Sequence, residues 1–147
     1  MHPRPRLLLA LLAVVACGGG RTAPGVVTTN VSVSDDEAAV TAVIGEALQA
    51  EAQGRRSDSL YAASAVVVVN GRNQFTSPRF AGIAPGGTVA VTSSQLQIRS
   101  GLAWGLVNYR WASADNSLVR EGRATLVLAV QRGGVWRIIH AHSSSPR

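Results

Sequence analysis

The chain of 147 residues contains one cysteine, no lysine and only eight acidic residues. A single cysteine cannot form an intramolecular disulfide, so the folded part must be held together by its core. The longest apolar run, residues 7–16, is about half as long as a helix that spans a bilayer. The 14 arginines are scattered, apart from the adjacent Arg55 and Arg56. A nucleic-acid-binding surface needs clustered basic residues with interleaved aromatics, so we expect no nucleic-acid partner.

The apolar run follows Arg4 and Arg6 and ends directly before Cys17. Its length and its basic flank are typical of a signal peptide, which predicts a cleaved segment over residues 1–16. The stretch V-V-A-C that ends at Cys17 resembles the lipobox of bacterial lipoproteins. This resemblance implies cleavage before Cys17, acylation of its thiol and a lipid-anchored protein of the cell envelope. The alternative is a free thiol in an ordinary signal peptide.

Residues 17–33 are rich in Gly, Thr and Ser and predict a flexible tether between the lipid and a domain over 34–147. The domain begins with S-D-D-E, a capping box whose N-cap is Ser34. Apolar residues then recur at helical spacing until Gly54, which is a stop signal. The pattern predicts a helix over 35–53.

The remaining pattern predicts a short second helix over D-S-L-Y-A-A, capped by Ser57, and then a strand over 65–69. The N-G pair that follows predicts a tight turn, and 76–87 predicts a loop with room for one helical turn. Four long antiparallel strands are expected over 88–99, 102–113, 118–131 and 135–143. The predicted class is α+β, with a strongly curved, cone-shaped antiparallel sheet wrapped round the long N-terminal helix.

The third long strand carries apolar residues on both of its faces. Leu126, Leu128 and Val130 have one parity, and Val127 and Ala129 have the other. An antiparallel sheet with one solvated face should instead alternate apolar and polar residues. We therefore expect the second face to be covered, most simply by another copy in a homodimer.

The order of elements and the ending G-G-V-W-R-I-I-H-A-H-S-S resemble the nuclear transport factor 2-like superfamily, and within it the SnoaL-like proteins. The stretch D-S-L-Y-A-A-S-A-V-V-V-V resembles their second helix and first strand, so that the resemblance covers residues 34–145. It implies a cone with a pocket at its open end, and dimers formed through the outer face of the sheet. The function expected from it is the binding of a small ligand or a partner in that pocket. The alternatives are a small-molecule isomerase, cyclase or hydrolase with a histidine as general base, and a structural dimerisation module.

Enzymes of the same superfamily use carboxylates that this chain lacks. In the ketosteroid isomerases an aspartate near the end of the first strand is the base, and the matching positions here are Val69 and Asn70. Epoxide hydrolases of this fold use an Asp–Arg–Asp set, whereas the four long strands here offer only Asp115 and Glu121. A paired-carboxylate mechanism therefore lacks its parts, and no catalytic residue is assigned.

Two of the three histidines, His140 and His142, lie on the last strand at a spacing of two. Regular alternation would place them on the same face as Trp136 and Ile138, which predicts that they line the interior of the cone. Two histidines without a third protein ligand make a poor zinc site, since only a carboxylate such as Glu121 is left to complete it. We expect no metal and no cofactor.

The pocket candidates share polar or aromatic character: Tyr61, Trp104, Asn108, Arg110, His140 and His142, with Arg99 nearby. Trp104, Asn108 and Arg110 have one parity on their strand, and Tyr109 and Trp111 have the other. If the first set faces inward, Asn108 and Arg110 approach the histidines. Arginine, histidine and asparagine over apolar walls would suit a small molecule with an anionic or carbonyl group.

The first prediction concerns the anchor. Replacing Cys17 by Ser should release the protein from the membrane fraction or leave its precursor uncleaved, because the thiol is the expected site of acylation. Membrane fractionation and mass spectrometry of the mature protein measure this. An unacylated Cys17 in the mature, unmodified protein would disprove the anchor.

Overall fold

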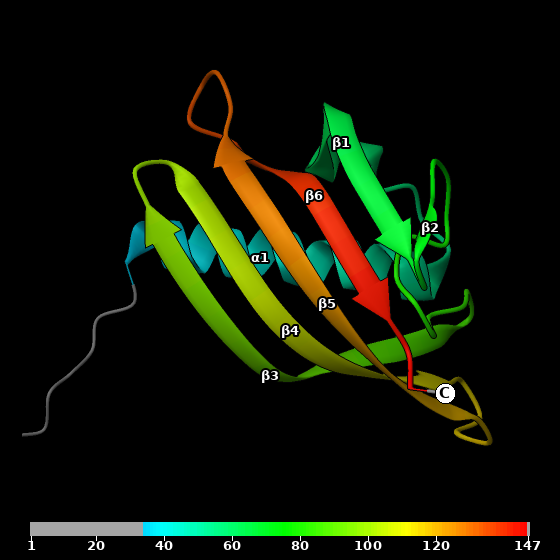
Figure 1. The fold of residues 1–147 in the computed structure, drawn as a ribbon. Helices are drawn as coiled ribbons and strands as arrows, with labels where there is room; N and C mark the ends of the chain where they lie inside the picture. Colours follow the sequence, from blue (N-terminus) through cyan, green and yellow to red (C-terminus); the bar gives the residue numbers. More distant parts are fainter. Residues whose placement is uncertain (1–33, 147) are drawn as a thin grey trace, which may run out of the picture. The chain divides into compact units, whose positions relative to one another are not determined.

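The computed structural model describes residues 34–146, which contain one α-helix, one short 3-10 helix and six strands (Figure 1). The elements in chain order are α1 (Asp35–Gln53), η1 (Asp58–Leu60), β1 (Tyr61–Val69), β2 (Arg72–Asn73), β3 (Gly87–Arg99), β4 (Leu102–Ser113), β5 (Val119–Val130) and β6 (Trp136–Ser144). The predicted signal peptide, Cys17 and the tether lie outside the described residues. Between residues 34 and 146 no helix is both long enough and apolar enough to cross a membrane.

The helix α1 has the predicted bounds, because both of its ends are capped locally. The Ser34 side chain accepts a hydrogen bond from the Glu37 amide at 3.1 Å, and Gly54 closes the helix in the left-handed conformation with φ 68°. Three acidic residues in the first turn lie near the positive end of the helix dipole. One stripe of the helix, including Val40, Ile44 and Leu48, is buried against the sheet.

The prediction of a short second helix over D-S-L-Y-A-A is wrong. Only a 3-10 turn, η1, forms, and β1 already begins at Tyr61. Ser57 makes no capping hydrogen bond, because its hydroxyl instead accepts a hydrogen bond from Arg79. The N-G turn is confirmed: Asn70 and Gly71 have φ values of 49° and 79°, which suit a tight hairpin between β1 and β2.

The four long strands are confirmed to within one or two residues at each end, and they form one sheet in the order β2-β1-β6-β5-β4-β3. All neighbours are antiparallel except β1 and β6, which run parallel. The sheet is therefore mixed, whereas an antiparallel one was predicted. Its strands curve, and α1 crosses one face (Figure 1). The α+β class and the curved sheet over a long helix are confirmed.

The loop between β2 and β3 fills space inside the curved sheet. Phe80, Ala81 and Ile83 are buried, and the Phe80 ring meets the Tyr109 ring edge-on with centroids 6.1 Å apart. The Tyr109 hydroxyl donates to the Ala81 carbonyl at 2.7 Å, and the Ala81 amide donates to the Ser143 hydroxyl at 2.9 Å. These bonds hold the loop against β4 and β6 and satisfy its buried backbone groups.

A close approach at Gly122 makes room for the Tyr109 ring. A Cβ at position 122 would lie about 2.4 Å from atoms of that ring, which no side chain tolerates. The β4–β5 pair places Gly122 directly opposite Tyr109, so the ring lies over the bare backbone of β5. Glycine at this position therefore permits the tyrosine to reach the loop.

The second prediction tests this buried bridge. Ser143→Ala would leave the Ala81 amide buried without an acceptor, which should lower the free energy of unfolding by about 1–3 kcal/mol. Ser144→Ala is the matched control, because Ser144 is exposed and should change stability by less than about 0.5 kcal/mol. Urea denaturation of both variants measures the difference. Equal stabilities would contradict the role of the bridge.

Candidate functional site

A β-bulge in β6 decides where the two histidines point. Along β5, Val127 is opposite His140 and the next residue, Leu128, is opposite Ile138, so Ile139 has no partner. The extra residue reverses the alternation of faces along the rest of the strand. Trp136 and Ile138 are buried before the bulge, whereas Ala141 and Ser143 are the buried residues after it.

The prediction that the histidines line the interior of the cone is therefore wrong. His140 and His142 do share a face, but it is the outer face of the sheet: His140 is half-buried and His142 is exposed. A physical reason is the size and polarity of their neighbours. The small side chains of Ala141 and Ser143 fit beneath the loop, whereas an imidazole there would have to be desolvated.

The side chains of β4 that were expected to face the pocket also lie on the opposite face of the sheet. Trp104, Asn108 and Arg110 point to the outer face, and Tyr109 and Trp111 are buried with the core. Gly105 contributes to this choice, because a Cβ there would lie 2.6 Å from a methyl carbon of Leu96. Five of the six pocket candidates thus lie together on the outer face, and only Tyr61 is inside.

The outer face has an apolar centre with the histidines beside it. Residues that are opposite one another on neighbouring strands form rows across this face. One row contains Gln97, Trp104, Val127, His140 and Val66. The next row contains Gln95, Leu106, Thr125, His142 and Val68. Trp104 is 39% exposed and Val66 is 50% exposed. A third row is polar, with Asn108 donating to Ser93 at 2.7 Å and accepting from Arg123 at 2.8 Å. Further along, Arg110 is opposite Glu121, and at the other end Arg99 is exposed.

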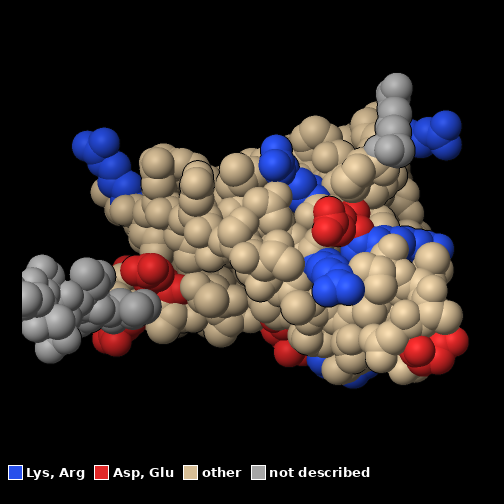
Figure 2. All heavy atoms as spheres, turned by 90° about the horizontal axis from the view of Figure 1, so that it is seen from below, with Lys and Arg blue, Asp and Glu red and all other residues tan. Residues whose placement is uncertain are grey.

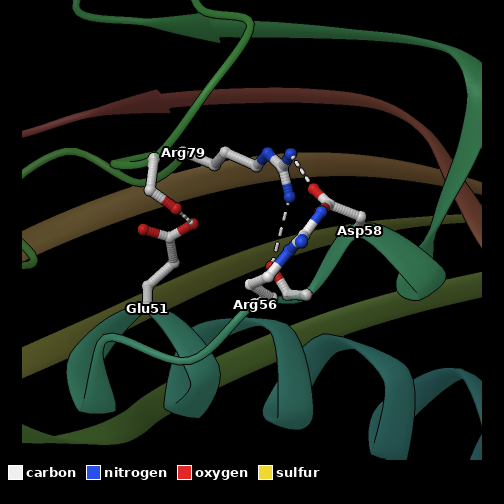
Figure 3. A network of polar contacts seen from close by, with 6 residues as sticks. Glu51, Arg56, Asp58 and Arg79 are labelled. Atoms are coloured by element: carbon white, nitrogen blue, oxygen red, sulfur yellow. Dashed lines mark hydrogen bonds and ion pairs between the residues drawn. The ribbon is translucent and has the colours of Figure 1, made fainter.

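Tyr61 lies beside a separate polar cluster where α1, η1 and the loop before β3 meet. Figure 3 shows four of its members, Glu51, Arg56, Asp58 and Arg79. The Arg79 guanidinium lies 4.5 Å from the centre of the Tyr61 ring, donates to Ser57 at 3.2 Å and donates to Asp58 at 2.5 Å. The Tyr61 hydroxyl is buried and has no hydrogen-bond partner among the described residues. Burial raises the pKa of Tyr61 above its ordinary value, although the nearby Arg79 opposes the shift.

Two carboxylates complete the cluster. Asp58 accepts hydrogen bonds from both Arg79 and Arg56, and these bonds lower the pKa of its carboxyl group. Glu51 is buried in α1 and accepts from the Ser77 hydroxyl at 2.9 Å. Of this group, only Tyr61 was predicted from the sequence. The available signal was a glutamate at a core position of α1, in register with Ala47 and Leu48.

Cavities adjoin both the cluster and the sheet. A polar groove of about 550 Å³ lies at one end of the outer face, beside Asn108, Glu121 and Arg123. A crevice of about 280 Å³ lies beside Tyr61 and Arg79. Neither contains His140 or His142. Within residues 34–146 no group of three or more His, Cys, Asp and Glu side chains is placed to hold a metal.

No family model and no curated protein sequence matches the chain. Solved structures do match it. A nuclear transport factor 2-like protein of unknown function from Pseudomonas putida has a TM-score of 0.58 and 21% identity, over 78% of this chain and 90% of its own. A protein with a cystatin-like fold from Nostoc punctiforme has a TM-score of 0.60 and 10% identity, over 76% and 91%. A candidate ketosteroid isomerase from Shewanella frigidimarina has a TM-score of 0.56 and 18% identity, over 76% and 95%.

These identities establish the fold alone. The domain has the nuclear transport factor 2-like fold, a curved sheet over one long helix. The resemblance stated from the final strand is thereby confirmed at the level of the fold.

The third prediction concerns the chain's two tyrosines, Tyr61 and Tyr109. Burial raises the pKa of both above the ordinary value of about 10. Each phenol stays protonated in the folded state while the unfolded chain ionises, so folding stability should be intact below pH 10 and fall as the pH rises further. The expected slope is roughly 1.4 kcal/mol per pH unit for each tyrosine.

Phenolate absorbance and circular dichroism, followed together from pH 9 to pH 12, measure this. The absence of lysine removes the other side chain that titrates in this range. The phenolates should appear only as the helical signal is lost, and Tyr61→Phe should make the loss shallower. Ionisation near pH 10 in a protein that stays folded would contradict the prediction.

Proposed function

We propose that the protein is a lipid-anchored, SnoaL-like interaction domain of the cell envelope that works through the outer face of its sheet. The observation that carries the proposal is the apolar centre of that face, around Trp104 and Val66 and beside both histidines. Such a face buries apolar area when a second sheet packs on it. The expected partner is a second copy of the chain, in a homodimer.

The composition of the face supports association rather than chemistry. Its centre is apolar or weakly polar, Arg99 and Arg110 lie towards the ends of their strands, and Arg123 lies in the polar row beside the centre. This is the arrangement of an interface with an apolar core and a polar rim.

A catalytic function for the histidines has less support. A general base needs a substrate held within hydrogen-bond reach, and neither the polar groove of the outer face nor the crevice beside Tyr61 is lined by His140 or His142. Part of the interior, where the resemblance led us to expect a pocket, is occupied by the side chains of Phe80, Ile83 and Tyr109. The name of the Shewanella protein is therefore no evidence of isomerase activity in this chain.

The fourth prediction tests the outer face. Trp104→Glu should convert a dimer into a monomer at micromolar concentration, because it places a charge in the apolar centre of the interface. Phe75→Glu is the control, since Phe75 is an aromatic residue with 87% exposure on a loop away from this face. Size-exclusion chromatography with light scattering measures the mass. A folded monomer before any substitution would overturn the dimer.

A further inference from the structure

A second site lies at the other side of the molecule, where the loop at residues 74–79 passes the start of β1. The crevice of about 280 Å³ beside Tyr61 adjoins a cavity of about 400 Å³ beside the turn at residues 54–57. Both are lined by Asp58, Phe75 and Arg79. We call the two cavities together the Arg79 crevice. It shares no residue with the apolar centre of the outer face.

Arg79 is held rigidly in this crevice. Its side chain is only 12% exposed, its guanidinium stacks on the Tyr61 ring, and two of its nitrogens are bonded to Ser57 and Asp58. A guanidinium has five N–H groups, so donors remain for a ligand. Since the long side chain is already ordered, binding to it costs little further conformational entropy.

The lining of the crevice carries excess positive charge. Three arginines, at positions 55, 56 and 79, line it with a single aspartate, Asp58. Arg55 is paired with Glu46 on α1, whereas Arg56 and Arg79 share the one carboxylate of Asp58. The buried Glu51 lines neither cavity and accepts its hydrogen bond from Ser77. A second carboxylate, supplied by a ligand, would balance the two guanidiniums.

The rest of the lining suits an apolar body. The Phe75 ring stands at the rim with 87% of its surface exposed, an unusual position for so large an apolar side chain. Ala62, Ala63, Ala65 and Val67 of β1 also line the crevice beside Tyr61, and we call them the alanine wall. Small side chains along this wall leave room for a flat group to lie against the strand. A ring bound there would cover the exposed face of Phe75.

We propose that the Arg79 crevice binds a small organic carboxylate with a flat, apolar body. The carboxylate bridges Arg56 and Arg79, and the body lies between Phe75 and the alanine wall. A planar carboxylate matches the geometry of a guanidinium, and its charge-assisted hydrogen bonds are stronger than those of a neutral analogue. The apolar wall and the exposed Phe75 ring favour such a molecule over a phosphorylated one without an apolar body.

The test uses benzoate as the probe and benzamide, which has nearly the same shape without the charge, as its control. Ligand-observed NMR titrations on the purified protein should give saturable binding of benzoate and binding of benzamide at least about tenfold weaker. Arg56→Gln and Phe75→Ala should each weaken benzoate about fivefold. Both side chains are highly exposed, so neither substitution should disturb folding. Arg72→Gln, an exposed arginine that lines neither cavity, should leave the affinity unchanged.

Several results would overturn the proposal. If benzoate does not bind, or if benzamide binds equally well, the crevice does not recognise a carboxylate and the proposal is wrong. Unchanged affinity in both Arg56→Gln and Phe75→Ala would place benzoate elsewhere. Inorganic phosphate that binds as tightly as benzoate and competes with it would reduce the crevice to a general anion site. Binding to phosphatidylglycerol vesicles that depends on Arg56 and Phe75, without binding of free benzoate, would assign this surface to the membrane.

Discussion

The unpaired residue Ile139 is the constraint on which the arrangement of both sheet faces depends. Neighbours on both sides of β6 adjust there: β5 shifts its register between Val127 and Leu128, and β1 shifts between Tyr61 and Val66. The shift lets Trp136 and Ile138 fill the core at one end of the strand, while smaller side chains fit beneath the loop at the other. One bulge thus reconciles two packing requirements that a regular strand cannot meet together.

Local signals predicted the elements of this fold well. The bounds of α1 follow from Ser34 and Gly54, and the hairpin after β1 follows from the N-G pair, because caps and turns depend on residues close together in the chain. The bulge has no comparable local signal. The doublet Ile138-Ile139 and the small residues at 141 and 143 allow it, but a regular strand is also consistent with them. Because the bulge at Ile139 was not predicted, both histidines were assigned to the wrong face of the sheet.

The polar cluster was missed for a different reason. Its members come from positions 51, 57, 58, 61, 77 and 79, on three elements and a loop, and no spacing along the chain links them. The loop itself reads as a run of Pro and Gly and gives no sign that Phe80 will be fully buried. Its anchors, Tyr109 and Ser143, lie 28 and 62 residues further along the chain. Such long-range contacts follow from the fold, and only the topology brings them together.

Phe80, Ile83 and Tyr109 fill part of the interior, whereas the polar groove and the Arg79 crevice lie at the outer face and at the rim of the sheet. The strand β3 is a free edge of the sheet. Its side chains on the outer face are polar, among them Ser93, Gln95 and Gln97, and polar side chains disfavour unspecific pairing with another strand. The association that we propose would therefore be directed to the centre of the face, where Trp104 and Val127 are adjacent. Figure 2 views the molecule from below, and on that side basic and acidic groups lie apart or in small mixed clusters. Selection of a partner at the apolar centre of this face would depend on the fit of its side chains, which is sensitive to the register that the bulge sets.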